Sequence, residues 1–164
     1  MTMRRLKEKP PPLTRSQVMA RVKSKDTTPE LKVRAALWRA GLRYRLHRAD
    51  LPGKPDLTFV SRRAVVFVHG CFWHGHDCPR GARMPKDNAD YWRRKIDRNR
   101  ARDQQAVTAL TALGWRVLTV WECEIKDPAR LAALAAAIRS SPAQGSAAPP
   151  DRHSAAAADR NSAA

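Results

Sequence analysis

One short segment, residues 66–78 with the sequence VFVHGCFWHGHDC, contains two of the three cysteines and three of the five histidines. Within it, Cys71, His76 and Cys78 lie close enough along the chain to bind one ion, and Cys123 is the remaining cysteine. Zinc prefers four nitrogen and sulfur ligands in structural sites, and soft thiolates disfavour magnesium or calcium. We therefore predict a structural Cys3His zinc site that ties this segment to the distant Cys123.

The alternative is that Cys71 and Cys123 are inert buried thiols, as many free cysteines are. If zinc is bound, four protein ligands leave no open position for water, so a catalytic metal must bind elsewhere. The odd number of cysteines, with no apolar signal-peptide core after the basic start, predicts a cytosolic protein without a disulfide framework.

Capping residues and β-rich runs along the chain indicate a single mixed α/β domain. Strands that alternate with helices imply a mixed sheet covered by helices on its faces. The predicted elements are helices at 14–22, from Thr28 to Gly41, at 89–113 and from Asp127-Pro128 to Ile138, and strands at 57–60, 64–68 and 115–121.

The two ends of the chain have the composition of unstructured segments. Residues 1–13 are predicted to form a flexible basic arm that could follow a phosphate backbone, or simply a solvated terminus. Residues 140–164 are rich in Ala, Ser and Pro and are predicted to be a disordered tail. The folded domain is therefore expected at 14–139.

The chain carries 32 Lys and Arg against 15 Asp and Glu, and the whole excess of 17 positive charges lies in residues 1–139. Such a field attracts a polyanion, of which nucleic acid is the commonest. No apolar run approaches ~20 residues and no lipidation signal is present, so a membrane partner is not expected. The candidate phosphate-contact surface, which could instead be a solvated helix face, is Arg93, Arg94, Lys95, Arg98 and Arg100.

Possible catalytic groups surround the same histidine-rich segment. Asp56 begins a β-run, where a carboxylate suits magnesium, although Pro-Asp pairs are often only turns. His69 and His74 are not needed for zinc, and histidine can deprotonate water or donate to a leaving oxygen near neutral pH. Asp103 and Glu30 alone would be typical helix ion-pair or first-turn acids.

Three segments, LPGKPD at 51–56, VFVHGCFWHGHDC at 66–78 and GWRVLTVWEC at 114–123, are similar to those of the very-short-patch repair (Vsr) endonucleases. With the intervening helices, the resemblance covers roughly residues 14–139. It implies a restriction-endonuclease-like fold, with a mixed central sheet flanked by helices and a structural zinc site. It also implies magnesium-dependent nicking of duplex DNA at T:G mispairs produced by deamination of 5-methylcytosine.

The resemblance also implies roles for individual residues. Asp56 would bind magnesium, and Val68 would contribute only its backbone carbonyl. In the wider nuclease superfamily an acid and a lysine usually stand where this chain has Val68 and His69. The other implied roles are His74 as the base that activates water with support from Asp103, His69 at the phosphate or leaving group, Glu30 near the hydrated metal, and Cys71, His76, Cys78 and Cys123 as zinc ligands.

Aromatic residues provide a candidate means of recognising the mispair. The resemblance assigns Phe72, Trp73 and Trp92 as wedges that enter the DNA, with Met19 as a smaller wedge from the minor-groove side. Met19 and Trp92 could instead be core residues. The periodicity of the remaining tryptophans predicts core positions for Trp38, Trp115 and Trp121.

Two rival functions remain at this point. A zinc-dependent DNA-binding module would account for the charge, the aromatic residues and the cysteines, but it leaves four residues unexplained: Asp56, His69, His74 and Asp103. A nuclease of the same fold with a different DNA substrate is separated only by the family motif. The expected partner is double-stranded DNA with a T:G mismatch, mismatch-repair proteins are further candidates, and a monomer in the bacterial cytosol or nucleoid is expected.

Overall fold

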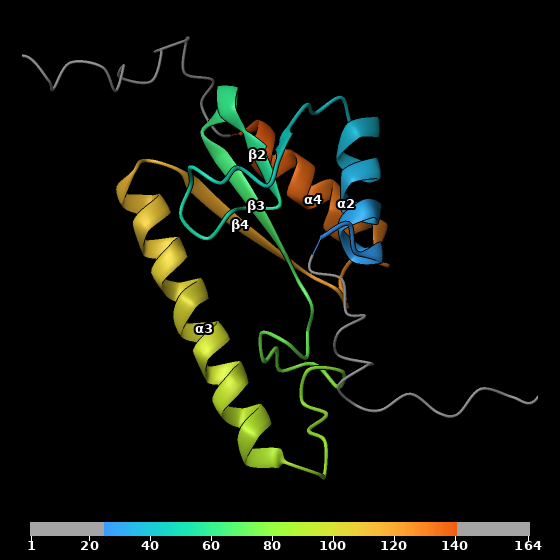
Figure 1. Ribbon diagram of the computed structural model, residues 1–164. Helices are drawn as coiled ribbons and strands as arrows, with labels where there is room; N and C mark the ends of the chain where they lie inside the picture. The colour runs from blue at the N-terminus through green and yellow to red at the C-terminus, as the bar shows by residue number, and fades with distance from the viewer. Residues whose placement is uncertain (1–24, 141–164) are drawn as a thin grey trace, which may run out of the picture.

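The computed structural model describes residues 25–140. The predicted helix at 14–22, the arm at 1–13, Met19 and the tail beyond Ser140 lie outside the described residues. Within 25–140 the elements are α2 (Thr28–Arg39), β1 (Arg45–Leu46), β2 (Leu57–Phe59), the 3-10 helix η1 (Val60–Arg62), β3 (Ala64–His69), α3 (Ala89–Ala112), β4 (Arg116–Trp121) and α4 (Pro128–Arg139) (Figure 1).

The four strands of residues 25–140 form one mixed sheet in the order β1-β2-β3-β4. The pairs β1–β2 and β2–β3 are antiparallel, and β3–β4 is parallel. The predicted strand pair at 57–60 and 64–68 is confirmed as β2 and β3, which η1 connects. The strand β1 was not predicted, because its two residues are both exposed and show no apolar alternation.

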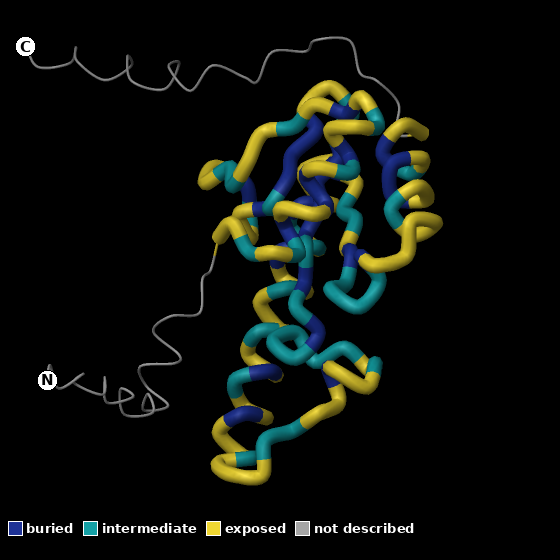
Figure 2. Tube along the Cα trace, turned by 90° about the vertical axis from the view of Figure 1, so that its right-hand side faces the viewer, coloured by how far each residue is buried: buried dark blue, intermediate teal, exposed yellow. Residues whose placement is uncertain are grey.

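Helices cover both faces of the sheet, as the alternation of side chains along β3 requires. Ala64 and Val66 pack into a core with α2 and α4, whereas Val65 and Phe67 pack into a second core with α3. The helix α3 continues past the end of the sheet, and the loop at 70–88 runs beside that extension (Figure 1). Figure 2 shows that most residues in this lower part of the molecule are exposed or half-buried.

Capping side chains fix where two of the helices begin. The N-cap of α2 is Thr27, one residue earlier than the predicted Thr28, because the Thr27 hydroxyl oxygen accepts from the Glu30 N–H at 3.4 Å. The predicted cap of α4 is confirmed, since the Asp127 carboxylate accepts from the Ala129 N–H at 2.8 Å.

The prediction that Trp38 belongs to the core is wrong. Its neighbour Leu37 takes the buried position on α2, so Trp38 faces outward and is 53% exposed. The Arg43 guanidinium lies over its ring, 3.8 Å from the centroid. Trp115 is buried as predicted, and Trp121 is half-buried. No helix among the described residues is long and apolar enough to cross a membrane.

Candidate functional site

The four predicted zinc ligands converge at one end of the sheet. The parallel register pairs His69 with Trp121, and Cys71 and Cys123 each lie two residues beyond that pair. Residues 70–78 turn back on themselves, because the His76 N–H donates to the Cys71 carbonyl at 2.9 Å. The ligand atoms of Cys71, His76, Cys78 and Cys123 all lie within 4.8 Å of one another.

The chemistry of this cysteine cluster suits a soft cation. The His76 Nδ1 lies 3.5 Å from the Cys123 Sγ, while its Nε2 lies 3.6 Å from the Asp77 carboxylate. A hydrogen bond from His76 lowers the pKa of Cys78 to about 6. Burial and the neighbouring sulfurs raise the pKa of Cys123 to about 12. Without a cation Cys123 therefore stays a thiol, and several thiolates can lie this close together only around a cation; the donor set fits zinc.

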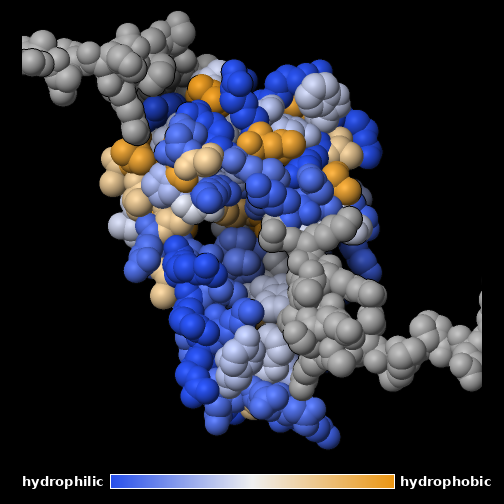
Figure 3. Space-filling view, viewed as in Figure 1, coloured by the Kyte–Doolittle hydropathy of each residue, from blue (hydrophilic) through white to orange (hydrophobic). Residues whose placement is uncertain are grey.

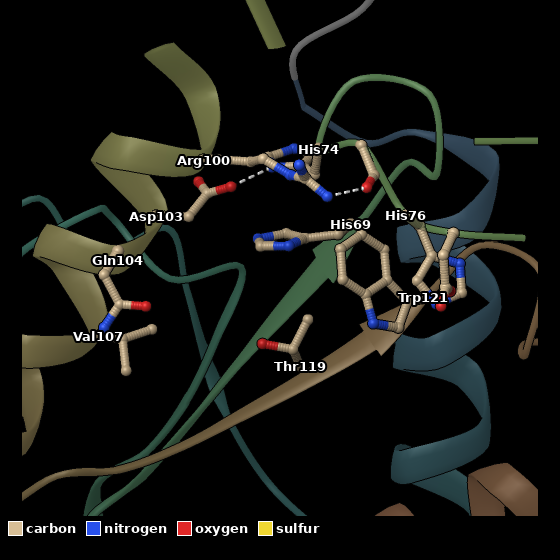
Figure 4. Close-up of a pocket in the computed structure, with 11 residues that line it drawn as sticks. His69, His74, His76, Arg100, Asp103, Gln104, Val107, Thr119 and Trp121 are labelled. Carbon is tan, nitrogen blue, oxygen red and sulfur yellow. Dashed lines mark hydrogen bonds and ion pairs between the residues drawn. The ribbon is translucent and has the colours of Figure 1, made fainter. Parts of the chain in front are cut away.

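A second cluster lies on the α3 side of the sheet end. The rings of His69 and His74 stack with centroids 3.8 Å apart and 7° between their planes. The Nδ1 of His74 lies 2.5 Å from Oδ2 of Asp103, which α3 contributes. Trp121 lies between the two clusters, with its ring 5.3 Å from that of His69 and 4.2 Å from that of His76 (Figure 4). These residues border an open hollow of about 500 Å³.

The two stacked imidazoles differ in their protonation chemistry. Burial and the adjacent His74 ring lower the pKa of His69 to about 4, so His69 is neutral at neutral pH. The Asp103 carboxylate can only accept a hydrogen bond, so in the neutral ring His74 carries its proton on Nδ1. The Nε2 of His74 is then a proton acceptor.

Asp56 is held against the end of β3. Its Oδ2 accepts from the Val68 N–H at 2.7 Å. Burial raises the pKa of Asp56, the Val68 N–H lowers it, and the nearby Glu30 carboxylate raises it. The N–H and C=O of a strand residue point to the same side, so the Val68 carbonyl faces the same edge as Asp56. Carboxylate and carbonyl oxygens are ligands that suit magnesium.

Glu30, by contrast, is already bonded to protein groups. Its Oε1 accepts from the Thr27 hydroxyl at 2.9 Å, and its Oε2 accepts from the Asp26 N–H at 3.0 Å. The Oε2 also accepts from the Arg34 guanidinium at 3.0 Å. Glu30 is therefore part of the α2 cap and of a buried ion pair, on the side of β1 and β2.

The three predicted wedge residues of the described chain form one aromatic cluster. The ring of Phe72 lies 5.2 Å from that of Trp73 and 5.5 Å from that of Trp92. Phe72 and Trp73 are half-buried, whereas Trp92 is 5% exposed. Among the described residues, the Trp92 indole N–H is buried without a hydrogen-bond partner. The burial of Trp92 agrees with the alternative that it is a packed residue.

The chain is similar in sequence to known proteins. The family model described as DNA mismatch endonuclease Vsr matches residues 8–80. The type II nicking enzyme V.XorIIP of Xanthomonas oryzae pv. oryzae is 55% identical over 129 residues, which cover 79% of this chain and 92% of that protein. The chain belongs to the Vsr family. It is a DNA endonuclease, and the mixed sheet agrees with the nuclease fold that this family implies.

Two further relatives of this Vsr-family chain are similar over much of its length. The DNA mismatch endonuclease Vsr of Escherichia coli K12 is 40% identical over 118 residues, covering 72% of this chain and 75% of the relative. The type II nicking enzyme V.NmeAIP of Neisseria meningitidis is 46% identical over 115 residues, covering 70% and 81%.

The structure brings the predicted site residues of this Vsr-family endonuclease into three groups. These are the cysteine cluster, the stack of His69 and His74 with Asp103, and Asp56 against Val68. Glu30 lies outside these direct contacts, and His47 connects it to Asp56. The Nδ1 of His47 is 3.9 Å from Oδ1 of Asp56, and its Nε2 is 3.9 Å from Oε2 of Glu30.

His47 and its partner Arg34 were missed by the sequence analysis. His47 is a single histidine in an irregular segment, and its place depends on β1, which was also missed. Arg34 is one of several basic residues between Thr28 and Gly41, and the sequence does not distinguish it from the others, yet it is only 8% exposed. No spacing in the sequence connects the two residues.

Proposed function

We propose that this Vsr-family endonuclease nicks double-stranded DNA at T:G mispairs that arise from deamination of 5-methylcytosine, and so begins very-short-patch repair. The observation that carries the proposal is the His74–Asp103 pair, stacked on His69 at the strand end whose backbone binds Asp56. A binding module has no need of an imidazole oriented by a carboxylate. The name of the Escherichia coli relative supports the mismatch assignment.

We assign Asp56 and the Val68 carbonyl to a magnesium ion. The Val68 N–H occupies Oδ2 of Asp56, so Oδ1 is the oxygen available for the metal. Magnesium, when bound there, supplies positive charge that stabilises the developing charge on the scissile phosphate. Glu30 adds negative charge nearby and is assigned to the water shell of the metal rather than to direct ligation, because it already accepts three hydrogen bonds, one of them from the Arg34 guanidinium that balances its charge.

His74 is the proposed general base. With Nδ1–H donated to Asp103, its Nε2 takes a proton from the attacking water, and the carboxylate stabilises the imidazolium that results. His69 stays neutral, which matters because two stacked imidazolium rings would repel each other. Its role at the phosphate or leaving oxygen is therefore that of a neutral N–H donor.

Zinc and the aromatic cluster serve the same site in this proposal. Zinc bound by the cysteine cluster would fix the loop at 70–78 against the ends of β3 and β4 and has no open position for catalysis. Phe72 and Trp73, on that loop, are the wedges that open the mispaired step, and Trp92 supports them from α3. The enzyme is expected to act as a monomer on its duplex.

The test uses the full chain with matched and T:G-mismatched duplexes, in magnesium or EDTA. We expect strand-specific nicks only in the mismatched duplex with magnesium. Asp56→Asn should lower the nicking rate by at least 100-fold, because it removes the metal-binding charge. Asp50→Asn is the matched control, since Asp50 lies in the same segment and pairs with Arg48 at the surface, and it should nick normally.

Other outcomes of this assay would favour one of the two rival functions. Equal cutting of both duplexes would favour a nuclease of the same fold with another substrate. Tight binding without cutting, in wild type and Asp56→Asn alike, would favour the zinc-dependent binding module.

A further inference from the structure

His47 is built between two carboxylates that belong to different elements. It follows β1 directly, and its backbone N–H donates to the Asp56 carbonyl at 3.4 Å. Its φ of 43° is a left-handed conformation that non-glycine residues seldom adopt. The imidazole thereby lies 3.9 Å from Asp56 on one side and 3.9 Å from Glu30 on the other. A strained backbone that places a ring between two acids suggests a functional constraint.

Arg34 determines which nitrogen of His47 carries the proton. The Arg34 Nη2 lies 2.9 Å from the His47 Nε2 and 3.0 Å from Oε2 of Glu30. A guanidinium has only donors, so the Nε2 of His47 must accept. The neutral imidazole then carries its hydrogen on Nδ1, the atom that faces Oδ1 of Asp56.

The Arg34 guanidinium also makes a separate metal site beside His47 unnecessary. Asp26, Glu30 and His47 have ligand atoms close enough together to hold an ion. However, Arg34 is in ion-pair contact with both Asp26 and Glu30, and it is nine-tenths buried among them. Its fixed positive charge already compensates this cluster, so a further cation is not needed.

We propose that His47 is a positioning residue, whose Nδ1–H, in the tautomer set by Arg34, orients the Asp56 carboxylate for the catalytic metal. The inference rests on the proposed function, because it takes Asp56 as the magnesium ligand. In this proposal the Val68 N–H holds Oδ2, and the His47 Nδ1–H, which lies 3.9 Å from Oδ1, would donate to one lone pair of Oδ1 and leave the other for the metal. A shift of about 1 Å brings Nδ1 and Oδ1 to the ~2.9 Å of a hydrogen bond.

Hydrogen bonds to the ligands of a metal typically change its affinity by about 10–100-fold. His47→Ala should therefore weaken metal binding by about that factor. His47→Asn should stay within about threefold of wild type, because its amide N–H replaces Nδ1–H. Arg48→Met, which removes the neighbouring arginine that pairs with Asp50 at the surface, is the control and should not change metal affinity.

The experiment measures Mn²⁺ binding by isothermal titration calorimetry to the zinc-loaded full chain, with Asp56→Asn as the reference for the site. Nicking of the T:G duplex against magnesium concentration is measured in parallel. In His47→Ala we expect a 10–100-fold higher Kd for Mn²⁺ and a matching rise in the magnesium needed for half-maximal nicking. The rate at saturating magnesium should largely recover.

Nitrogen-15 NMR of the imidazoles provides a readout independent of metal. The wild type should show His47 as the Nδ1–H tautomer, and Arg34→Met should shift it toward a mixture. A wild-type Nε2–H tautomer would overturn the proposal. So would wild-type Mn²⁺ affinity in His47→Ala, or equal impairment of His47→Asn and His47→Ala, which would indicate a space-filling role.

The same measurements distinguish failure of the proposed function from failure of the positioning role alone. If Asp56→Asn binds Mn²⁺ as tightly as wild type, Asp56 is not the metal ligand and both proposals fall. If wild type nicks the mismatch and depends on Asp56, but His47→Ala behaves as wild type does, only the positioning role is overturned.

Discussion

At the scale of single residues, the buried ring of His69 gives the fold a specific sensitivity to acid. The unfolded chain takes up this proton near pH 6.5, whereas the folded chain resists it until about pH 4. Between these values the unfolded state binds more protons, so the free energy of unfolding falls as the pH falls. Between pH 7.5 and 4.5, the free energy of unfolding of the wild type should fall by about 2 kcal/mol more than that of His69→Gln.

Urea unfolding of both proteins at the two pH values, with zinc bound at the start, measures this difference. Release of zinc by acid affects both proteins alike, and equal m-values would show that the unfolded states are comparable. Parallel loss of stability in the two proteins would mean that His69 does not resist protonation in the folded chain.

Residues differ in how far the sequence could identify them. The convergence of Cys71, His76, Cys78 and Cys123 was predictable, because a metal site is one of the few arrangements that use three free cysteines and a histidine together. His47 was not, because its role depends on a left-handed backbone and on an arginine contributed by another element. Trp38 was misplaced because helical periodicity alone does not distinguish a core ring from one covered by Arg43.

At the scale of elements, the loop at 70–88 depends on glycine at a point of close backbone approach. A Cβ on Gly81 would lie 2.0 Å from the His76 carbonyl oxygen and 2.9 Å from that of Cys71. Backbone atoms cannot move aside cheaply, so Gly81→Ala should displace the zinc-binding turn. We expect the wild type to hold about one zinc per chain, as a four-ligand structural site does, and Gly81→Ala to hold much less and to nick at least tenfold more slowly.

Metal analysis of the purified proteins and the nicking assay test this expectation. Gly41→Ala is the control, because a Cβ there meets nothing within 4 Å and only the φ of 78° is unfavourable. It should cost about 1 kcal/mol of stability, because an L-residue is strained in the left-handed conformation, and leave zinc and nicking unchanged. Full zinc content in Gly81→Ala would show that the turn adapts, and zinc-free wild type with its fold retained would refute the site.

Long elements with clear end signals were predictable to within a residue or two. The helix α3 and the strand β4 match the predicted 89–113 and 115–121 closely, because long apolar periodicity and Gly114 mark them. The strand β1 lacked such a signal, since tertiary pairing with β2 alone makes it a strand. As a result, the sheet could be predicted from the sequence, but the edge strand β1, which His47 follows directly, could not.

At the scale of the whole molecule, positive charge accumulates beside the proposed site. Figure 3 shows strongly hydrophilic side chains along the lower left of the molecule, where α3 lies in Figure 1. Not every predicted phosphate contact there is equally free, because Arg93 pairs with Asp90 and Arg100 donates to the Gly75 carbonyl. Arg94 and Arg98 are exposed and lie one turn apart on the helix, and Arg98 donates only its Nε, to the Arg94 carbonyl of the same helix, so they are the best candidates for phosphate contacts.

Binding that releases counterions from DNA weakens linearly on a double-logarithmic salt plot, with a slope of about 0.9 per phosphate neutralised. Replacing Arg94 and Arg98 together with Gln should therefore reduce that slope by about 2, and equally for matched and mismatched duplexes, since phosphate contacts carry no sequence information. Binding titrations in EDTA over a range of salt concentrations measure the slope without cleavage. Arg39→Gln, on α2 across the sheet, is the control and should leave it unchanged. An unchanged slope in the double variant would place the DNA away from α3, whereas a loss confined to the mismatched duplex would assign these arginines to mispair recognition.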